Sequence, residues 1–216
     1  MKSYRFSMLL ITLLLLLLFY PFLDHFELTG LTMLLNAFTS LILLSSVYAV
    51  GDNRRQMVIA LAIILPALVL GWANPFFQVK EIQVIADMLM VAAFVFVAFH
   101  ILGYALRRGR VDMEKIAAAV CVYLLLGVIW HDLYAIVDAL IPESFNSALL
   151  TKNHFIYFSF ITLSTLGYGD ITPVNGPAQA LAYTEALVGQ LYLTILVARL
   201  VGLHIAYTGP DCSDDA

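Results

Sequence analysis

The chain has 216 residues, of which 62% are apolar and 12% are charged, and its formal net charge is -4. This composition excludes an ordinary soluble domain, which carries about twice this share of charged residues. The apolar residues form long runs on several separate segments, a pattern that a membrane requires and a globular core does not. Two cysteines, Cys121 and Cys212, show neither a disulfide pattern nor metal-ligand spacing.

Six apolar segments are predicted to cross the membrane as helices, because a bilayer core of about 30 Å takes roughly 20 helical residues. Short polar stretches separate them. The first segment could instead be a signal peptide, since it has a basic start and an apolar middle, but no small-residue cleavage pattern follows it. The predicted spans cover roughly residues 6–23, 31–50, 57–74, 82–106, 115–141 and 178–206.

The basic residues gather on one side of these spans. Eight of the 11 fall in the N-terminus, the second loop and the fourth loop: Lys2, Arg5, Arg54, Arg55, Arg107, Arg108, Arg110 and Lys115. Loops rich in Lys and Arg stay in the cytoplasm. We therefore expect a multi-pass protein of the cell (inner) membrane with both termini in the cytoplasm and residues 143–177 facing outward.

A shorter apolar segment at residues 154–164 precedes the last span and is too short to cross a bilayer as a helix. It must enter the membrane and return, and non-helical backbone at that depth survives only inside protein or beside water. The residues that follow, Thr165–Asp170, read TLGYGD. Glycines at 167 and 169 allow backbone angles closed to other residues, so successive carbonyl groups can point the same way.

The TLGYGD stretch resembles the signature of the tetrameric potassium channel superfamily, and in particular of bacterial members whose pore is a helix, a re-entrant loop and a helix. The resemblance covers about residues 115–206, and Leu166 stands where many members have valine. It implies an all-α membrane protein with six transmembrane helices per chain, a re-entrant pore helix and a selectivity-filter loop. Four copies of the chain would form one central homotetrameric pore.

The resemblance also assigns roles to individual residues. Potassium ions would bind the backbone carbonyls of a filter that consists of Thr165, Leu166, Gly167, Tyr168 and Gly169, with ion sites at the first four. Asp170 would lie just outside the filter and be held by Tyr157. Ile161 stands where some members carry a glutamate that pairs with this aspartate.

Gly189 follows Asp170 by 19 residues, the spacing at which family members keep a hinge glycine in the inner helix. A close helix contact is the alternative interpretation, since glycines in membrane helices often serve packing. Helical spacing from Gly189 directs a set of residues toward the pore cavity. This set is Gln190, Leu193, Thr194 and Val197.

Two charged residues of the last span have two interpretations each. Arg199 lies near the inner interface, where it would extend toward water, or it could form an ion pair with Asp112 or Glu114. Glu185 would sit behind the filter, hydrogen-bonded or protonated, or could take part in conduction.

His131 and Asp132 in the fifth span are interpreted as helix contacts, with a proton sensor as the alternative. An intramembrane protease would need a Ser/His pair or paired aspartates on facing spans. Asp132 and Asp138 are six residues apart on one helix and therefore point apart, so we predict no enzyme.

The chain is predicted to divide into a four-helix transmembrane domain (1–106), a cytoplasmic linker (107–114), a pore domain (115–206) and a short acidic cytoplasmic tail (207–216). Voltage-gated relatives carry arginines at every third position of the fourth span. The fourth span here has no Lys or Arg, so the first domain is not expected to be a voltage sensor.

These features together predict a channel that conducts K⁺ passively and selectively and is not steeply voltage-gated. Its partners would be three further copies of the chain, membrane lipids and K⁺, without nucleic acid and with no cofactor beyond the permeant ion. The alternatives are a non-selective cation channel, or a non-conducting membrane sensor or assembly subunit. The gating stimulus would come from the first four spans or from a regulatory partner.

Overall fold

The computed structural model describes residues 5–24, 37, 39–44, 54–77, 79–107, 109, 111–146 and 154–208. Within these residues the chain is all-helical, as predicted, and contains an isolated bridge between Phe145 and Pro173 but no strand. The named helices are α1 (Arg5–Asp24), α3 (Arg54–Phe77), α4 (Lys80–Ala105), α5 (Met113–Leu140), α6 (His154–Leu163) and α7 (Gly176–Thr208).

Each of these helices matches a predicted apolar segment to within about three residues at either end. Three of them are long and apolar enough to cross a membrane: Lys80–Ala105, Met113–Leu140 and Gly176–Leu203. The apolar stretches of α1 and α3, Arg5–Phe19 and Met57–Ala73, are shorter. The multi-pass membrane character is therefore plain, whereas the count of six spans stays a prediction.

The predicted second span, 31–50, lies largely outside the described residues. Its residues 39–44 are helical, and the Trp72 indole of α3 donates a hydrogen bond of 3.1 Å to the Ser40 hydroxyl. The predicted acidic tail also lies outside the described residues beyond Thr208.

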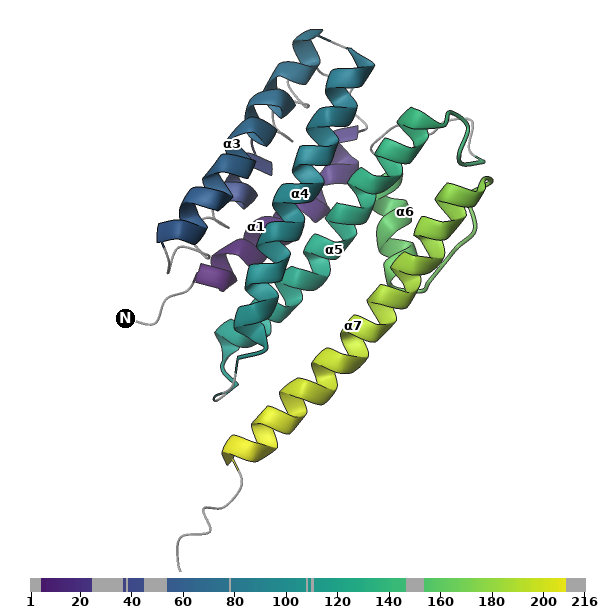
Figure 1. Cartoon of the computed structure of the whole chain (residues 1–216). Coiled ribbons are helices and arrows are strands. Elements are labelled where there is room, and N and C mark those ends of the chain that lie inside the picture. Colours follow the sequence, from purple (N-terminus) through teal and green to yellow (C-terminus); the bar gives the residue numbers. More distant parts are fainter. Residues whose placement is uncertain are drawn as a thin grey trace, which may run out of the picture.

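Helix α5 is the centre of the arrangement (Figure 1). Helices α1 and α4 pack against one side of it, with α3 beyond α4, and helices α6 and α7 pack against the other. One buried apolar cluster runs through most of these elements and includes Leu9 of α1, Phe94 of α4 and Leu125 of α5. Because the cluster also contains Ile156 of α6 and Leu196 of α7, the two predicted domains share one core.

Hydrogen bonds connect the first residues of α1 with the start of α5. The Asp112 side chain caps α5 by accepting a hydrogen bond of 3.0 Å from the Lys115 N–H. The Glu114 carboxylate accepts hydrogen bonds from the Phe6 N–H, at 3.0 Å, and from the Ser7 hydroxyl. A carboxylate at these first residues of α1 satisfies donors that have no partner within the helix and complements the positive end of the helix dipole.

Candidate functional site

The short helix α6 lies between α5 and α7 and leads into the TLGYGD stretch (Figure 1). Its 10 residues extend only about 15 Å, half the thickness of a bilayer core. Six of them are buried, among them Phe155, Phe158 and Ser159. A half-length helix that enters and ends inside the fold is what the sequence predicted for 154–164.

The backbone from Thr165 to Gly169 alternates in handedness. Positive φ angles occur at every second residue: 59° at Thr165, 52° at Gly167 and 79° at Gly169. Glycine adopts this region without steric cost, whereas a β-branched threonine there is strained. Such alternation of left-handed and right-handed residues allows successive carbonyl groups to point toward one side, unlike a β-strand, in which they alternate.

The start of the loop that carries these residues is hydrogen-bonded to α6, and its residues are exposed. The N–H groups of Leu166 and Gly167 both donate to the Ile161 carbonyl of α6, at 2.9 and 3.1 Å. All seven residues of 164–170 are nevertheless exposed in the single chain, with Leu166 at 55% and Tyr168 at 68%. A non-helical loop of this kind cannot face lipid at membrane depth, so it must be covered by protein or line a water-filled cavity.

Asp170 is held as the resemblance implied. The Tyr157 hydroxyl of α6 donates a hydrogen bond of 2.8 Å to the Asp170 carboxylate. The next residue, Ile171, is buried against α5 and α6 in a second apolar cluster with Tyr134 and Phe158. The end of the loop is therefore fixed from both sides.

Beyond Asp170 the chain forms backbone hydrogen bonds with residues 144–146, which follow α5. The Asn146 N–H donates to the Thr172 carbonyl at 3.0 Å, and the Val174 N–H donates to the Ser144 carbonyl at 2.9 Å. The Asn175 side chain then caps α7 by accepting from the Ala178 N–H at 3.0 Å. The start of α7 is thus set relative to the loop.

Gly189 sits where α7 crosses the end of α6. A Cβ atom at this position would collide with the Leu163 carbonyl oxygen and come within 3.0 Å of Leu163 Cδ1. Helix α7 runs without interruption through this residue. The close-contact interpretation therefore has direct geometric support, while the hinge interpretation stays a prediction.

The four residues predicted to line a cavity all lie on an exposed face of α7. They are Gln190, Leu193, Thr194 and Val197. The Gln190 amide donates a hydrogen bond of 3.0 Å to the Thr165 hydroxyl at the start of the loop. This contact joins the predicted cavity wall to the predicted filter.

Arg199 is exposed and forms no ion pair with Asp112 or Glu114. Glu114 is instead committed to the first residues of α1, which the sequence did not indicate. Extension toward the interface fits the exposure of Arg199, while the ion-pair alternative stays a prediction.

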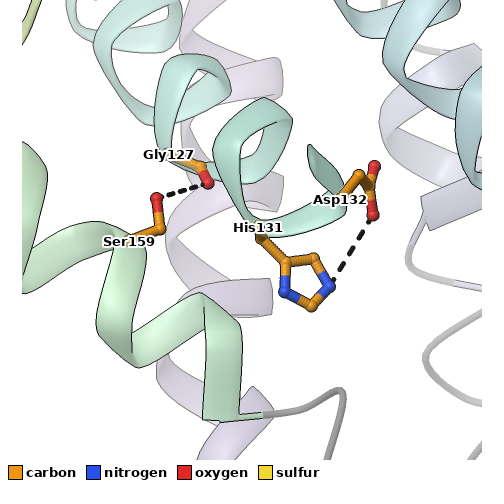
Figure 2. Close-up of polar contacts among 4 residues, drawn as sticks. All are labelled: Gly127, His131, Asp132 and Ser159. Atoms are coloured by element: carbon orange, nitrogen blue, oxygen red, sulfur yellow. Dashed lines mark hydrogen bonds and ion pairs between the residues drawn. The ribbon is translucent and has the colours of Figure 1, made fainter. Parts of the chain in front are cut away.

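His131 and Asp132 are buried on α5, with 3.7 Å between His131 Nε2 and Asp132 Oδ1 (Figure 2). They lie about one turn beyond Gly127, whose carbonyl accepts a hydrogen bond of 2.8 Å from the Ser159 hydroxyl of α6. The contact is between neighbours on one helix, and the proton-sensor role stays untested.

The sequence did not indicate the partners of Glu185. This residue is fully buried in α7 and contacts the hydroxyl groups of Tyr134 on α5 and Ser159 on α6, both at 2.5 Å. Helical periodicity could place Glu185 behind the loop, but only the packing of three helices brings these hydroxyls to it.

Comparison with known proteins agrees with the site. The family described as "Ion channel" matches residues 118–204. Among curated proteins, two from Oryza sativa subsp. japonica are similar: "Two pore potassium channel a" is 28% identical over 91 residues, and "Two pore potassium channel c" is 32% identical over 82 residues. "Protein LctB" of Bacillus caldotenax is 36% identical over 84 residues. No solved structure matches the chain significantly.

These similarities cover 42%, 37% and 37% of this chain, and 24%, 16% and 57% of the three relatives in the same order. The chain therefore shares only part of the length of each relative. The matched family and the two Oryza relatives are described as channels. Residues 118–204, which carry α6, the TLGYGD loop and most of α5 and α7, match an ion-channel family and are similar to potassium channels, and this similarity supports membership of the potassium channel superfamily.

Proposed function

We propose that this protein is a potassium-selective channel of the inner membrane, with six spans per chain, in which four copies surround one pore. The observation that carries the proposal is the backbone of Thr165–Gly169, with its positive φ angle at every second residue. Carbonyl groups directed to one side can replace the hydration shell of a cation that passes along the pore axis.

The proposed tetramer follows from the same loop. One chain contributes one row of carbonyl groups. A ring of carbonyl groups around the pore axis therefore needs several copies of the chain. The exposed 164–170 loop and the exposed face of α7 are the surfaces that such copies would cover. Asp170 and Tyr157 would stabilise the outer end of the filter, and Gln190 the inner end.

The non-selective cation channel is the second candidate, because fewer carbonyl sites in series discriminate less between K⁺ and Na⁺. The unbroken alternation of backbone handedness over five residues favours the selective channel. A non-conducting sensor or assembly subunit would have no need of the strained Thr165 backbone.

Purified protein in liposomes is expected to pass K⁺ and Rb⁺ and largely to exclude Na⁺, because a ring of backbone carbonyls replaces the hydration shell of the ions that it selects. Reversal potentials measured in planar bilayers with opposed gradients test this. Protein-free bilayers serve as the control. A reversal potential that follows the Na⁺ gradient as strongly as the K⁺ gradient would establish the non-selective alternative.

The channel is expected to show only a shallow voltage dependence. Within α4 the one Lys or Arg is Lys80, its first residue, and Arg107 comes after its last, so neither lies deep in the field. Steep gating takes 3–4 charges in each of four subunits, whereas we expect at most about two effective charges per channel.

Conductance–voltage curves in symmetric K⁺ measure this charge. The variant Asp87→Asn, which neutralises the one acid deep within α4, is the matched control and should leave the slope nearly unchanged. A conductance–voltage slope equivalent to about ten or more gating charges would contradict the prediction that residues 1–106 do not form a voltage sensor.

A further inference from the structure

A buried polar cluster, composed of Glu185, Tyr134, Ser159 and the Gly127 carbonyl, lies where α5, α6 and α7 meet. The Tyr134 hydroxyl contacts one oxygen of Glu185 at 2.5 Å, and the Ser159 hydroxyl contacts the other at 2.5 Å. Ser159 also reaches the Gly127 carbonyl at 2.8 Å (Figure 2). Glu185, Ser159 and Tyr134 are each 0% exposed, so water has no access to them.

The number of hydrogens that these contacts require determines whether the Glu185 carboxyl group is protonated. Three oxygen–oxygen contacts need three hydrogens, and the hydroxyls of Tyr134 and Ser159 supply two. A carboxylic acid at Glu185 supplies the third: it donates to Ser159, Ser159 donates to Gly127, and Tyr134 donates to the other Glu185 oxygen. An ionised Glu185 would leave one contact without a hydrogen, and no described basic residue contacts it to offset burial of the charge.

The cluster is connected to the loop through α6. Ser159 lies two residues before Ile161, whose carbonyl accepts the N–H groups of Leu166 and Gly167. The two helices that hold Ser159, α5 and α7, do not themselves enter the loop. These hydrogen bonds therefore contribute, beside the apolar packing of Phe155 and Phe158, to the position of α6 and, through Ile161, of the loop backbone.

We propose that Glu185, as a neutral carboxylic acid, is a positioning residue for the selectivity filter and locks α6 to α5 and α7. This inference rests on the proposed function, since it concerns how the filter is held. Four copies of the cluster would surround the filters of a tetramer. Loss of the cluster would loosen the filter without removing any ion-binding group.

The test compares Glu185→Gln with Glu185→Leu in the reconstituted full-length channel. Glutamine can accept from Tyr134 and donate to Ser159, as the neutral acid does, so its Rb⁺ uptake and K⁺/Na⁺ selectivity should stay within about twofold of the wild type. Leucine of similar volume leaves the Tyr134 hydroxyl without its acceptor and the Ser159 oxygen without its donor, and should lower selective Rb⁺ uptake by about tenfold or more.

Asp87→Leu is the matched control, because Asp87 is a buried acid of α4, which does not pack on α6 or α7 among the described helices. If it lowered selectivity as much as Glu185→Leu, the effect would be general and the proposal overturned. Should Glu185→Leu fail to assemble, Ser159→Ala and Tyr134→Phe remove single hydroxyls, and each should lower selectivity. Wild-type K⁺/Na⁺ selectivity in both single-hydroxyl variants would overturn the proposal.

Infrared spectroscopy gives a readout that does not require conduction. The wild type should show a protonated carboxyl C=O band at neutral pH that Glu185→Gln removes and Asp87→Asn does not. Absence of that band, or equal defects in Glu185→Gln and Glu185→Leu, would overturn the neutral-acid assignment. Failure of the wild type to conduct K⁺ would refute the proposed function while leaving this band as the decisive result for Glu185.

Discussion

Replacing Gly167 by alanine is expected to reduce K⁺ conduction by at least about a hundredfold while leaving the tetramer assembled. Gly167 has φ 52°, and a side chain in this region costs about 1–2 kcal/mol per residue, or about 4–8 kcal/mol over four subunits. A loss of that size exceeds the roughly 2.7 kcal/mol that corresponds to a hundredfold change. The added Cβ would meet nothing within 4 Å in the single chain, so the strain falls on the loop backbone and not on helix packing.

Rubidium uptake into liposomes measures the loss, and size-exclusion chromatography measures assembly. The matched control is Gly176→Ala at the start of α7, where φ is not positive and a Cβ also meets nothing within 4 Å. The control should conduct as the wild type does. Selective uptake by Gly167→Ala at the level of the control would mean that the 165–169 backbone is not the conduction path.

Replacing Gly189 by alanine is expected to weaken both the assembled channel and its selectivity. The new Cβ would collide with the Leu163 carbonyl oxygen and approach the Leu163 carbonyl carbon to 3.2 Å. Backbone atoms cannot rotate away as a side chain can, so α7 and the end of α6 must separate. Overpacking of this kind costs about 1–3 kcal/mol in each subunit.

The temperature at which tetramers dissociate distinguishes the two interpretations of Gly189. Close packing predicts a lower temperature for Gly189→Ala. A hinge predicts an equal or higher one, because alanine favours a helix over glycine by about 1 kcal/mol. Gly202→Ala is the control in the same helix, since a Cβ there meets nothing within 4 Å. A stable Gly189→Ala channel with altered opening alone would establish the hinge.

The sequence by itself determined that this is a helical membrane protein and which residues form the candidate filter. Apolar runs of about 20 residues fix helices wherever a bilayer is the solvent, because each backbone group must find its partner within the segment. The short run 154–164 and the glycines at 167 and 169 likewise predicted α6 and the loop. These are local properties of the chain, set by length, composition and the freedom of glycine.

Contacts between distant segments could not be read from the sequence. Periodicity assigned Gly189 to one face of its helix but could not say that the Leu163 carbonyl lies against it. Glu114 was a candidate partner for Arg199, yet α1, more than 100 residues earlier, binds it instead. Glu185 gains the hydroxyls of Tyr134 and Ser159 only because three helices converge there. A helix pattern gives the direction of a side chain, whereas its partner is decided by how helices cross, and that is set by packing of the whole fold.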